Sequence, residues 1–136
     1  MDKGITKNKS HRGKIGVLGE GIAAQFLEKK GFKIVERNYW KPWGEIDIIA
    51  EKDGVVHFVE VKTVTREMGN ADVSHAGPEY RPEEQIHPTK LHKVGRTAEM
   101  YMNNKGDHRD FQVDALGVLL DVPKKVAQCR LFEQVL

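Results

Sequence analysis

GEIDIIAEKDGVVHFVEVKT, residues 44–63, decides the fold of this chain. Two apolar-rich runs flank Asp53-Gly54, a dipeptide typical of a two-residue hairpin loop, in which both positions need positive φ. With that loop, Asp47 lies opposite Glu60 on the neighbouring strand. Because side chains alternate between the faces of a sheet, Asp47, Glu60 and Lys62 then share one face. A loop of three residues would instead turn Asp47 to the other face.

The two faces of this predicted hairpin differ in composition. One face is apolar apart from a histidine, and we expect it to cover a core. The other face carries Ile49 and Phe58 near the turn and charged residues further out, which favours the rim of a partly covered cleft. The core-facing set is Ile46, Ile48, Ala50, Val55, His57, Val59 and Val61.

Two carboxylates and a lysine on one small surface form a candidate magnesium site. Neighbouring carboxylates repel each other, so one of them holds a proton unless a cation compensates the charge. Mg²⁺ or Mn²⁺ suits this role, since hard cations prefer oxygen ligands. The alternative is an ordinary surface hairpin with cross-strand ion pairs, such as Glu45 with Lys62. Spacing alone leaves both interpretations open.

Composition limits the classes of protein that the chain can represent. With 136 residues, a net charge of +2 and a pI near 8.6, it has the size of one domain and no global positive field. Any affinity for nucleic acid must therefore come from local clusters of charge. The single cysteine excludes an internal disulfide and a cysteine-based zinc site. No run is long enough to span a membrane and the N-terminus has no apolar signal region, so we expect a cytoplasmic protein without a membrane partner.

The segments before the hairpin predict a basic arm, a helix and a strand. Residues 1–13 are basic and poor in apolar side chains, so we expect a flexible arm, followed by a single domain over residues 14–136. Apolar residues recur at helical spacing over 14–30, and Gly31 suits a C-terminal cap. Glu20 lies on this helix among three glycines, either as an exposed glutamate or at the edge of the packed face. Residues 32–39 are predicted to form a strand.

The segments around and after the hairpin supply candidate nucleic-acid contacts. Trp40 and Trp43 lie beside the carboxylates and could stack on bases, or could simply cover the edge of the core. Regular structure is expected to stop over 64–88, where the chain could form a flap over substrate. Thr89 could cap a second helix reaching Asn103, with a buried stripe of Leu91, Val94, Ala98 and Tyr101. Its other side presents Lys90, Lys93 and Arg96, a row that could grip a phosphate backbone or could be an ordinary solvated face.

The last part of the chain completes an α/β pattern. Residues 110–120 and 126–135 are predicted to be strands, and Asp114 within the first of them needs a partner, more simply a structural one than a catalytic one. The order helix, three strands, loop, helix and two strands predicts a central mixed sheet flanked by helices.

These residues resemble a known family. GEIDIIA, the hairpin turn and FVEVKT, together with the helix around Gly19-Glu20 and Asn38, look like the YraN-like family of small bacterial proteins. The helix around Lys90 and the strand holding Phe111 and Asp114 fit the same family, over about residues 13–120. That family is placed in the PD-(D/E)XK nuclease superfamily, so the resemblance implies a restriction-endonuclease-like αβββαβ core.

The resemblance also implies a function and a set of roles. Asp47 and Glu60 would be metal ligands assisted by the main-chain carbonyl of Val61, and Lys62 would be the catalytic lysine. Glu20 matches a first-helix glutamate that some branches, including Holliday-junction resolvases, bring to the metal. We therefore expect a Mg²⁺- or Mn²⁺-dependent endonuclease acting on nucleic acid, in the first place DNA. A homodimer would suit a junction, because two cuts need two sites related by symmetry. Ile46-Asp47 replaces the superfamily's Pro-Asp dipeptide, and the alternative is a binding module that keeps the scaffold without catalysis.

Overall fold

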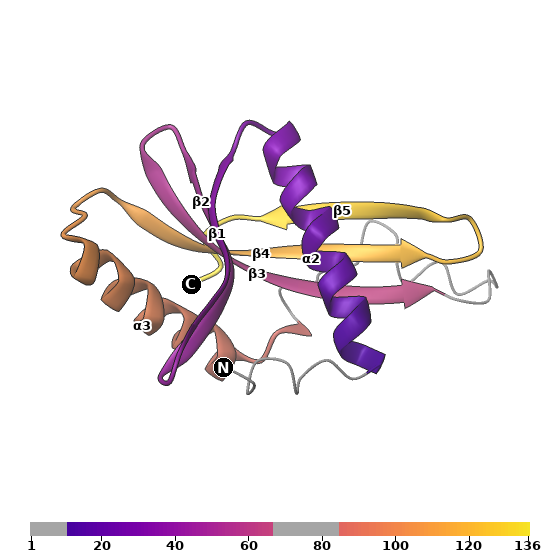
Figure 1. Ribbon diagram of the computed structural model, residues 1–136, viewed down its shortest axis with the longest axis horizontal. Helices are drawn as coiled ribbons and strands as arrows, with labels where there is room; N and C mark the ends of the chain where they lie inside the picture. The colour runs from indigo at the N-terminus through magenta and orange to yellow at the C-terminus, as the bar shows by residue number, and fades with distance from the viewer. Residues whose placement is uncertain (1–10, 67–84) are drawn as a thin grey trace.

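The fold is a single mixed sheet with one helix on each face (Figure 1). The computed structural model describes residues 11–66 and 85–136. Five strands lie in the order β1-β2-β3-β4-β5, with β3 and β4 parallel and the other neighbours antiparallel. This confirms the predicted α/β class and the mixed sheet. The elements are α2 (His11–Lys29), β1 (Lys33–Lys41), β2 (Gly44–Lys52), β3 (Val55–Arg66), α3 (Pro88–Lys105), β4 (Phe111–Asp121) and β5 (Val126–Phe132).

The central hairpin forms with the predicted register. Asp53 and Gly54 have φ values of 53° and 79°, so both loop residues are left-handed, as a type I′ turn requires. The strand partners run from Lys52↔Val55 to Ile48↔Val59. The Asp-Gly dipeptide was therefore sufficient to fix which residues of β2 and β3 face each other.

Two apolar clusters cover the two faces of the sheet. The cluster beneath α2 includes Leu27, Ile48 and Val59, and α2 runs across β3, β4 and β5 in Figure 1. The cluster beneath α3 includes Ile49 and Phe58, both completely buried. This face of the hairpin is therefore covered near the turn, where α3 closes over Ile49 and Phe58. The cleft was expected at the charged residues further out, and Glu45 and Lys62 do line pockets there.

Ile46 also departs from the predicted pattern. It belongs to the cluster beneath α3, on the opposite side from Ile48. Regular pairing of β2 with β3 stops at Ile48, so the strict alternation of faces is not maintained beyond it. Gly44, at the start of β2, packs closely against Thr97 of α3, which draws this end of the strand toward the helix.

Most helix and strand ends agree with the sequence within a few residues. Gly31 (φ 96°) adopts the left-handed conformation expected after the first helix, and Gly106 (φ 62°) does the same after α3. His87, and not Thr89, caps α3, since its Nδ1 accepts the Thr89 N–H at 3.1 Å. Strand β3 continues to Arg66 alongside β4, so residues 64–66 are not irregular as expected. The remainder of the expected flap, 67–84, and residues 1–10 of the expected arm lie outside the described residues.

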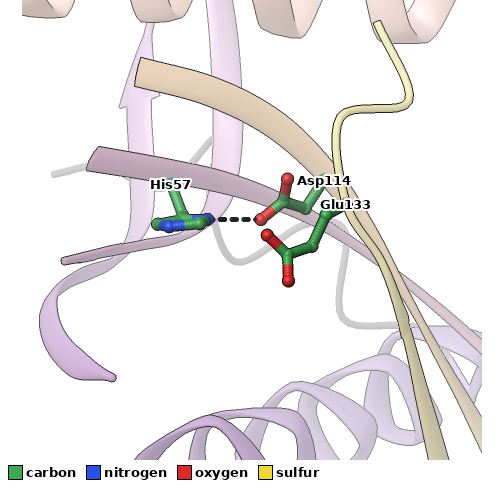
Figure 2. A group of neighbouring side chains, drawn as sticks. All are labelled: His57, Asp114 and Glu133. Atoms are coloured by element: carbon green, nitrogen blue, oxygen red, sulfur yellow. Dashed lines mark hydrogen bonds and ion pairs between the residues drawn. The ribbon is translucent and has the colours of Figure 1, made fainter. Parts of the chain in front are cut away.

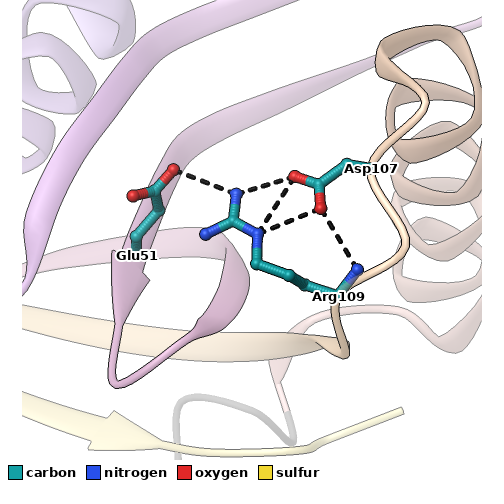
Figure 3. Close-up of polar contacts among 3 residues, drawn as sticks. All are labelled: Glu51, Asp107 and Arg109. Atoms are coloured by element: carbon teal, nitrogen blue, oxygen red, sulfur yellow. Dashed lines mark hydrogen bonds and ion pairs between the residues drawn. The ribbon is translucent and has the colours of Figure 1, made fainter.

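An ion-pair network ties the loop after α3 to the hairpin (Figure 3). The Arg109 guanidinium lies between two carboxylates, with Nη2 2.7 Å from Asp107 Oδ2 and 3.2 Å from Glu51 Oε2. Hydrogen bonds from the Arg109 side chain and backbone lower the pKa of Asp107 to about 2. The Val56 N–H donates to the Asp110 carbonyl at 3.0 Å, so the start of β4 is held beside the start of β3.

None of the helices in residues 11–66 and 85–136 is long and apolar enough to cross a membrane.

Candidate active site

The site begins where β2 separates from β3. In the observed register, continued pairing would join the Val61 N–H to the backbone of Ile46. The Val61 N–H instead donates to Asp47 Oδ2 at 2.8 Å. The N–H and carbonyl of one strand residue point to the same edge, so the Val61 carbonyl is directed toward this gap as well. The separation of the strands thus places the Asp47 carboxylate and a backbone carbonyl at one position.

Three acidic side chains from three elements meet at this gap. Asp47 of β2 interacts with Glu60 of β3, and each carboxylate affects the other's protonation. The Glu20 side chain, from α2, hydrogen-bonds with Asp47. We call Glu20, Asp47 and Glu60 the carboxylate centre. Asp47 therefore lies beside Glu20, Glu60 and Val61, although the three carboxylates are not all within 4.8 Å of one another.

Burial makes this centre costly to ionise. It raises the pKa of Asp47, although the Val61 N–H and the Lys90 ammonium oppose the rise. Burial and the neighbouring Asp47 charge raise the pKa of Glu60 to about 8. Glu60 Oε1 is also buried without a hydrogen-bond partner. An unsatisfied buried carboxylate oxygen costs free energy unless a cation or donor reaches it, so the donor set fits a divalent ion.

Lys90 lies at the carboxylate centre, although the sequence predicted that it would belong to a row on the other side of α3 from the buried stripe. Its Nζ is 3.6 Å from Glu45 Oε2 and 3.7 Å from Glu60 Oε2. Burial lowers the pKa of Lys90, but the charges of Glu60 and Glu45 outweigh this effect and the pKa is raised. One ammonium thus faces three carboxylates, those of Glu45, Asp47 and Glu60. The remaining negative charge favours a further cation.

Glu45 and the central position of Lys90 are the site features that the sequence did not reveal. Glu45 was considered as a partner of Lys62 across the hairpin, but it lies against Lys90 of α3. That contact depends on where α3 packs over β2, and no local pattern specifies it.

Lys62 faces a groove that also reaches Glu20. The groove, of about 410 Å³, lies between α2 and β3, and Lys62 is partly exposed in it. Gly19 is required at its edge because a Cβ there would collide with the Thr63 side chain. Gly16 also lines the groove, yet a Cβ at Gly16 would meet no atom of the described residues within 4 Å. The fold around Gly16 therefore offers no steric reason for a glycine in mid-helix.

The other predicted contacts with nucleic acid lie on exposed surface. Lys93 and Arg96 are exposed on α3, and Trp40 and Trp43 are exposed at the β1–β2 turn. Lys93 and Trp40 line a common pocket with Lys90, whereas Trp43 and Arg96 do not line it. The predicted row of Lys90, Lys93 and Arg96 is thus divided between the centre and the surface.

A second acidic group lies elsewhere, at His57, Asp114 and Glu133 (Figure 2). Within residues 11–66 and 85–136 it is the only group of three His, Cys, Asp or Glu side chains whose ligand atoms all lie within 4.8 Å of one another. Asp114 Oδ2 is 2.7 Å from His57 Nδ1, and Oδ1 accepts hydrogen bonds from the Gln112 side chain and the Gln134 N–H. Both oxygens of Asp114 are thus occupied by protein donors. This confirms the structural role predicted for Asp114, and the group needs no metal.

Comparison with known sequences places the site within a matched region. The sequence model of an uncharacterised protein family, UPF0102, matches residues 19–118, which include the carboxylate centre and Lys62. A UPF0102 protein of Campylobacter jejuni is 39% identical over 107 residues, covering 79% of this chain and 85% of its own. One from Helicobacter pylori is 41% identical over 109 residues (80% and 83%), and one from Wolinella succinogenes is 42% identical over 101 residues (74% and 82%).

Proposed function

Because the chain belongs to UPF0102, an uncharacterised family, its function has to be argued from the site, and we propose that it is a divalent-metal-dependent nuclease. It would hydrolyse phosphodiester bonds in nucleic acid, in the first place DNA. The observation that carries the proposal is the meeting of Asp47 and Glu60 at a gap in the sheet, where Glu60 Oε1 is buried and unbonded. The resemblance to the PD-(D/E)XK superfamily, with its D…E-x-K set, supports the same activity.

The ligand set follows from the donors at the gap. Asp47, Glu60 and the Val61 carbonyl would hold Mg²⁺ or Mn²⁺, and Glu20 would complete the set from α2. All these donors are oxygens, which suits hard cations and not soft ones. A divalent cation bound there would supply Lewis-acid activation of the phosphodiester and of the attacking water.

The side chains around the centre have separate tasks. Lys62 reaches the groove beside Glu20, where its ammonium would orient the nucleophilic water or stabilise negative charge that develops on the phosphate. Lys90 limits repulsion among the carboxylates and keeps Glu45 and Glu60 in place. Lys93 and Arg96, exposed on α3, would position the phosphate backbone without reading sequence.

The test is cleavage of a labelled panel of substrates by purified protein. The panel contains single-stranded, duplex, flap and four-way-junction DNA and single-stranded RNA, each with Mg²⁺, Mn²⁺ or EDTA. Asp47→Ala and Lys62→Ala are compared with wild type, and Glu28→Ala, a variant at an exposed position near the end of α2, is the control. We expect metal-dependent cutting that both site variants lose and the control retains. Far-ultraviolet circular dichroism checks that all variants are folded.

Two results would reject the nuclease. Cutting at the wild-type rate by Asp47→Ala would show that the activity does not arise at this centre. Binding of nucleic acid without cutting, indifferent to Mg²⁺ and to Asp47→Ala, would identify a binding module on a nuclease-like scaffold. Such binding would weaken steeply with salt, because it would depend on phosphate contacts.

A further inference from the structure

A second pocket lies beside the carboxylate centre, and Lys90 belongs to both. It occupies about 210 Å³ between the β1–β2 turn and α3. Its charged lining consists of Lys41, Lys90, Lys93 and Glu45, which gives it a net positive charge. Trp40 forms its aromatic wall. This combination of features is absent from the centre itself, which is acidic.

Trp40 is exposed to an unusual extent for a tryptophan. Trp40 is 54% exposed, whereas Trp43 is 44% exposed and the strand neighbours Tyr39 and Lys41 are half-buried. Ring contacts among the described residues join Tyr39 to Tyr101 and Phe58 to Tyr101, and none of them involves Trp40. A large exposed indole next to ammonium groups is the arrangement that binds unpaired nucleotides, since the ring stacks on the base and the cations contact the phosphate.

The charged side chains of this pocket favour an anionic ligand. Lys93 is exposed, and Lys41 lies along the Tyr39 ring, with Nζ 5.5 Å from the ring centroid. Lys90 is held between Glu45 and Glu60, so the only carboxylate in the lining, Glu45, already faces a cation. The ammonium groups of Lys41 and Lys93 therefore remain to attract an anion such as phosphate.

We propose that Trp40, Lys41 and Lys93 form a subsite for an unpaired nucleotide of single-stranded DNA or RNA. The base stacks on Trp40 and the adjoining phosphate contacts Lys93. Lys90 separates this subsite from Glu60 by a single side chain, so a nucleotide held there lies next to the phosphate presented to the carboxylate centre. One consequence rests on the proposed nuclease function: the preferred substrates should contain a single-stranded segment beside the scissile bond.

The experiment measures binding without cleavage. Fluorescence anisotropy follows titration of labelled dT and rU oligonucleotides of about twelve nucleotides, near the site size of single-strand binders. A blunt duplex of the same length is the third probe, and all buffers contain EDTA. The variants are Trp40→Ala, Trp40→Phe and Lys93→Ala. Trp43→Ala is the matched control, since Trp43 is 44% exposed at the same turn but does not line the pocket.

We expect Trp40→Ala to weaken single-strand binding by about fivefold or more, which is the lower range for loss of one stacked base. Trp40→Phe should retain part of that affinity, because phenylalanine also stacks. Lys93→Ala should weaken binding and lower the slope of log affinity against log salt by about 0.7, the value for one phosphate contact to a single strand. Trp43→Ala should bind single strands as tightly as wild type, within about twofold.

The outcomes separate this inference from the nuclease proposal. Equal single-strand affinities for Trp40→Ala and Trp43→Ala would overturn the subsite, as would an equal loss of blunt-duplex binding in Trp40→Ala. Weaker binding of dT or rU by Trp40→Ala, with the affinity retained in Trp43→Ala, would support the subsite. These titrations contain EDTA and measure binding without cleavage. They therefore test the subsite even if no cleavage is detected in the nuclease assay.

Discussion

Replacing Glu60 by glutamine should stabilise the metal-free protein at alkaline pH. Glu60 is buried beside Asp47, and its pKa rises from 4.5 to about 8. Between these values the native carboxyl holds a proton that the unfolded chain has released. The native state then binds more protons than the unfolded state, so the free energy of unfolding decreases as the pH increases. Glutamine has the same shape and cannot ionise, so Glu60→Gln avoids this loss.

The size of the effect follows from the pKa. A rise from 4.5 to about 8 corresponds to an upper limit of about 5 kcal/mol. Asp47 and Lys90 adjust to the charge of Glu60, and water can enter on ionisation, so we expect about 1–3 kcal/mol at pH 8. For a domain of this size that range raises Tm by roughly 3–10 °C. As the pH falls toward 4.5, Glu60 becomes protonated in the unfolded chain as well as in the native state. The difference in stability between Glu60→Gln and wild type should therefore become small at pH 5.

The assay is thermal unfolding in EDTA at pH 5, 6.5 and 8, followed by circular dichroism. Glu99→Gln, an exposed glutamate on α3, is the control and should change Tm by little at any pH. Adding Mg²⁺ at pH 8 should raise Tm of wild type more than that of Glu60→Gln, since a ligand stabilises the state that binds it. The reasoning is refuted if wild type and Glu60→Gln show the same dependence on pH, or if Glu60→Gln is the less stable at pH 8.

Further predictions concern the rest of the chain. Asp114→Ala should destabilise the fold by about 3 kcal/mol or more, because it leaves the buried His57 without its partner and removes two part-buried hydrogen bonds from Gln112 and Gln134; in urea denaturation, a loss no larger than that of the exposed Glu133→Gln would contradict this. Gly16→Ala should stabilise the protein by up to about 1 kcal/mol, since alanine favours a helix and a Cβ meets no described atom, yet it should reduce cleavage by narrowing the groove. Unfolding and cleavage are measured on the same preparation, and unchanged cleavage would show that substrate does not approach Gly16. Lys90→Met should lower metal-free stability at pH 8, because it removes the ammonium that faces Glu45 and Glu60; unaltered urea unfolding would show that the ammonium does not offset the carboxylates.

The features that sequence predicted are those set by local rules. Asp53-Gly54 fixed the turn and hence the pairing of Ile48 with Val59, and the buried stripe of α3 followed from helical spacing. Asp47 and Glu60 interact as predicted, although regular pairing of β2 with β3 ends one residue earlier, at Ile48. The family resemblance added Glu20, which reaches Asp47 from a helix that is distant in sequence.

The features that sequence missed depend on packing between distant segments. Ile46 changes face because β2 leaves β3 and its start packs on α3. Strand β3 extends to Arg66 because β4 provides a parallel partner as far as Asp121. Lys90 enters the carboxylate centre because α3 crosses the end of β2. None of these contacts is encoded in a spacing or a motif.

The proposed function requires that Asp47 and Glu60 hold a divalent cation. Mn²⁺ binding tests this requirement most directly. Electron paramagnetic resonance counts free Mn²⁺ during titration of wild type, Asp47→Ala and the control Glu28→Ala at pH 8. We predict one saturable site on wild type and the control, displaced by Mg²⁺ and lost in Asp47→Ala. Binding to Asp47→Ala as tight as to wild type, or no binding to wild type, would contradict the account.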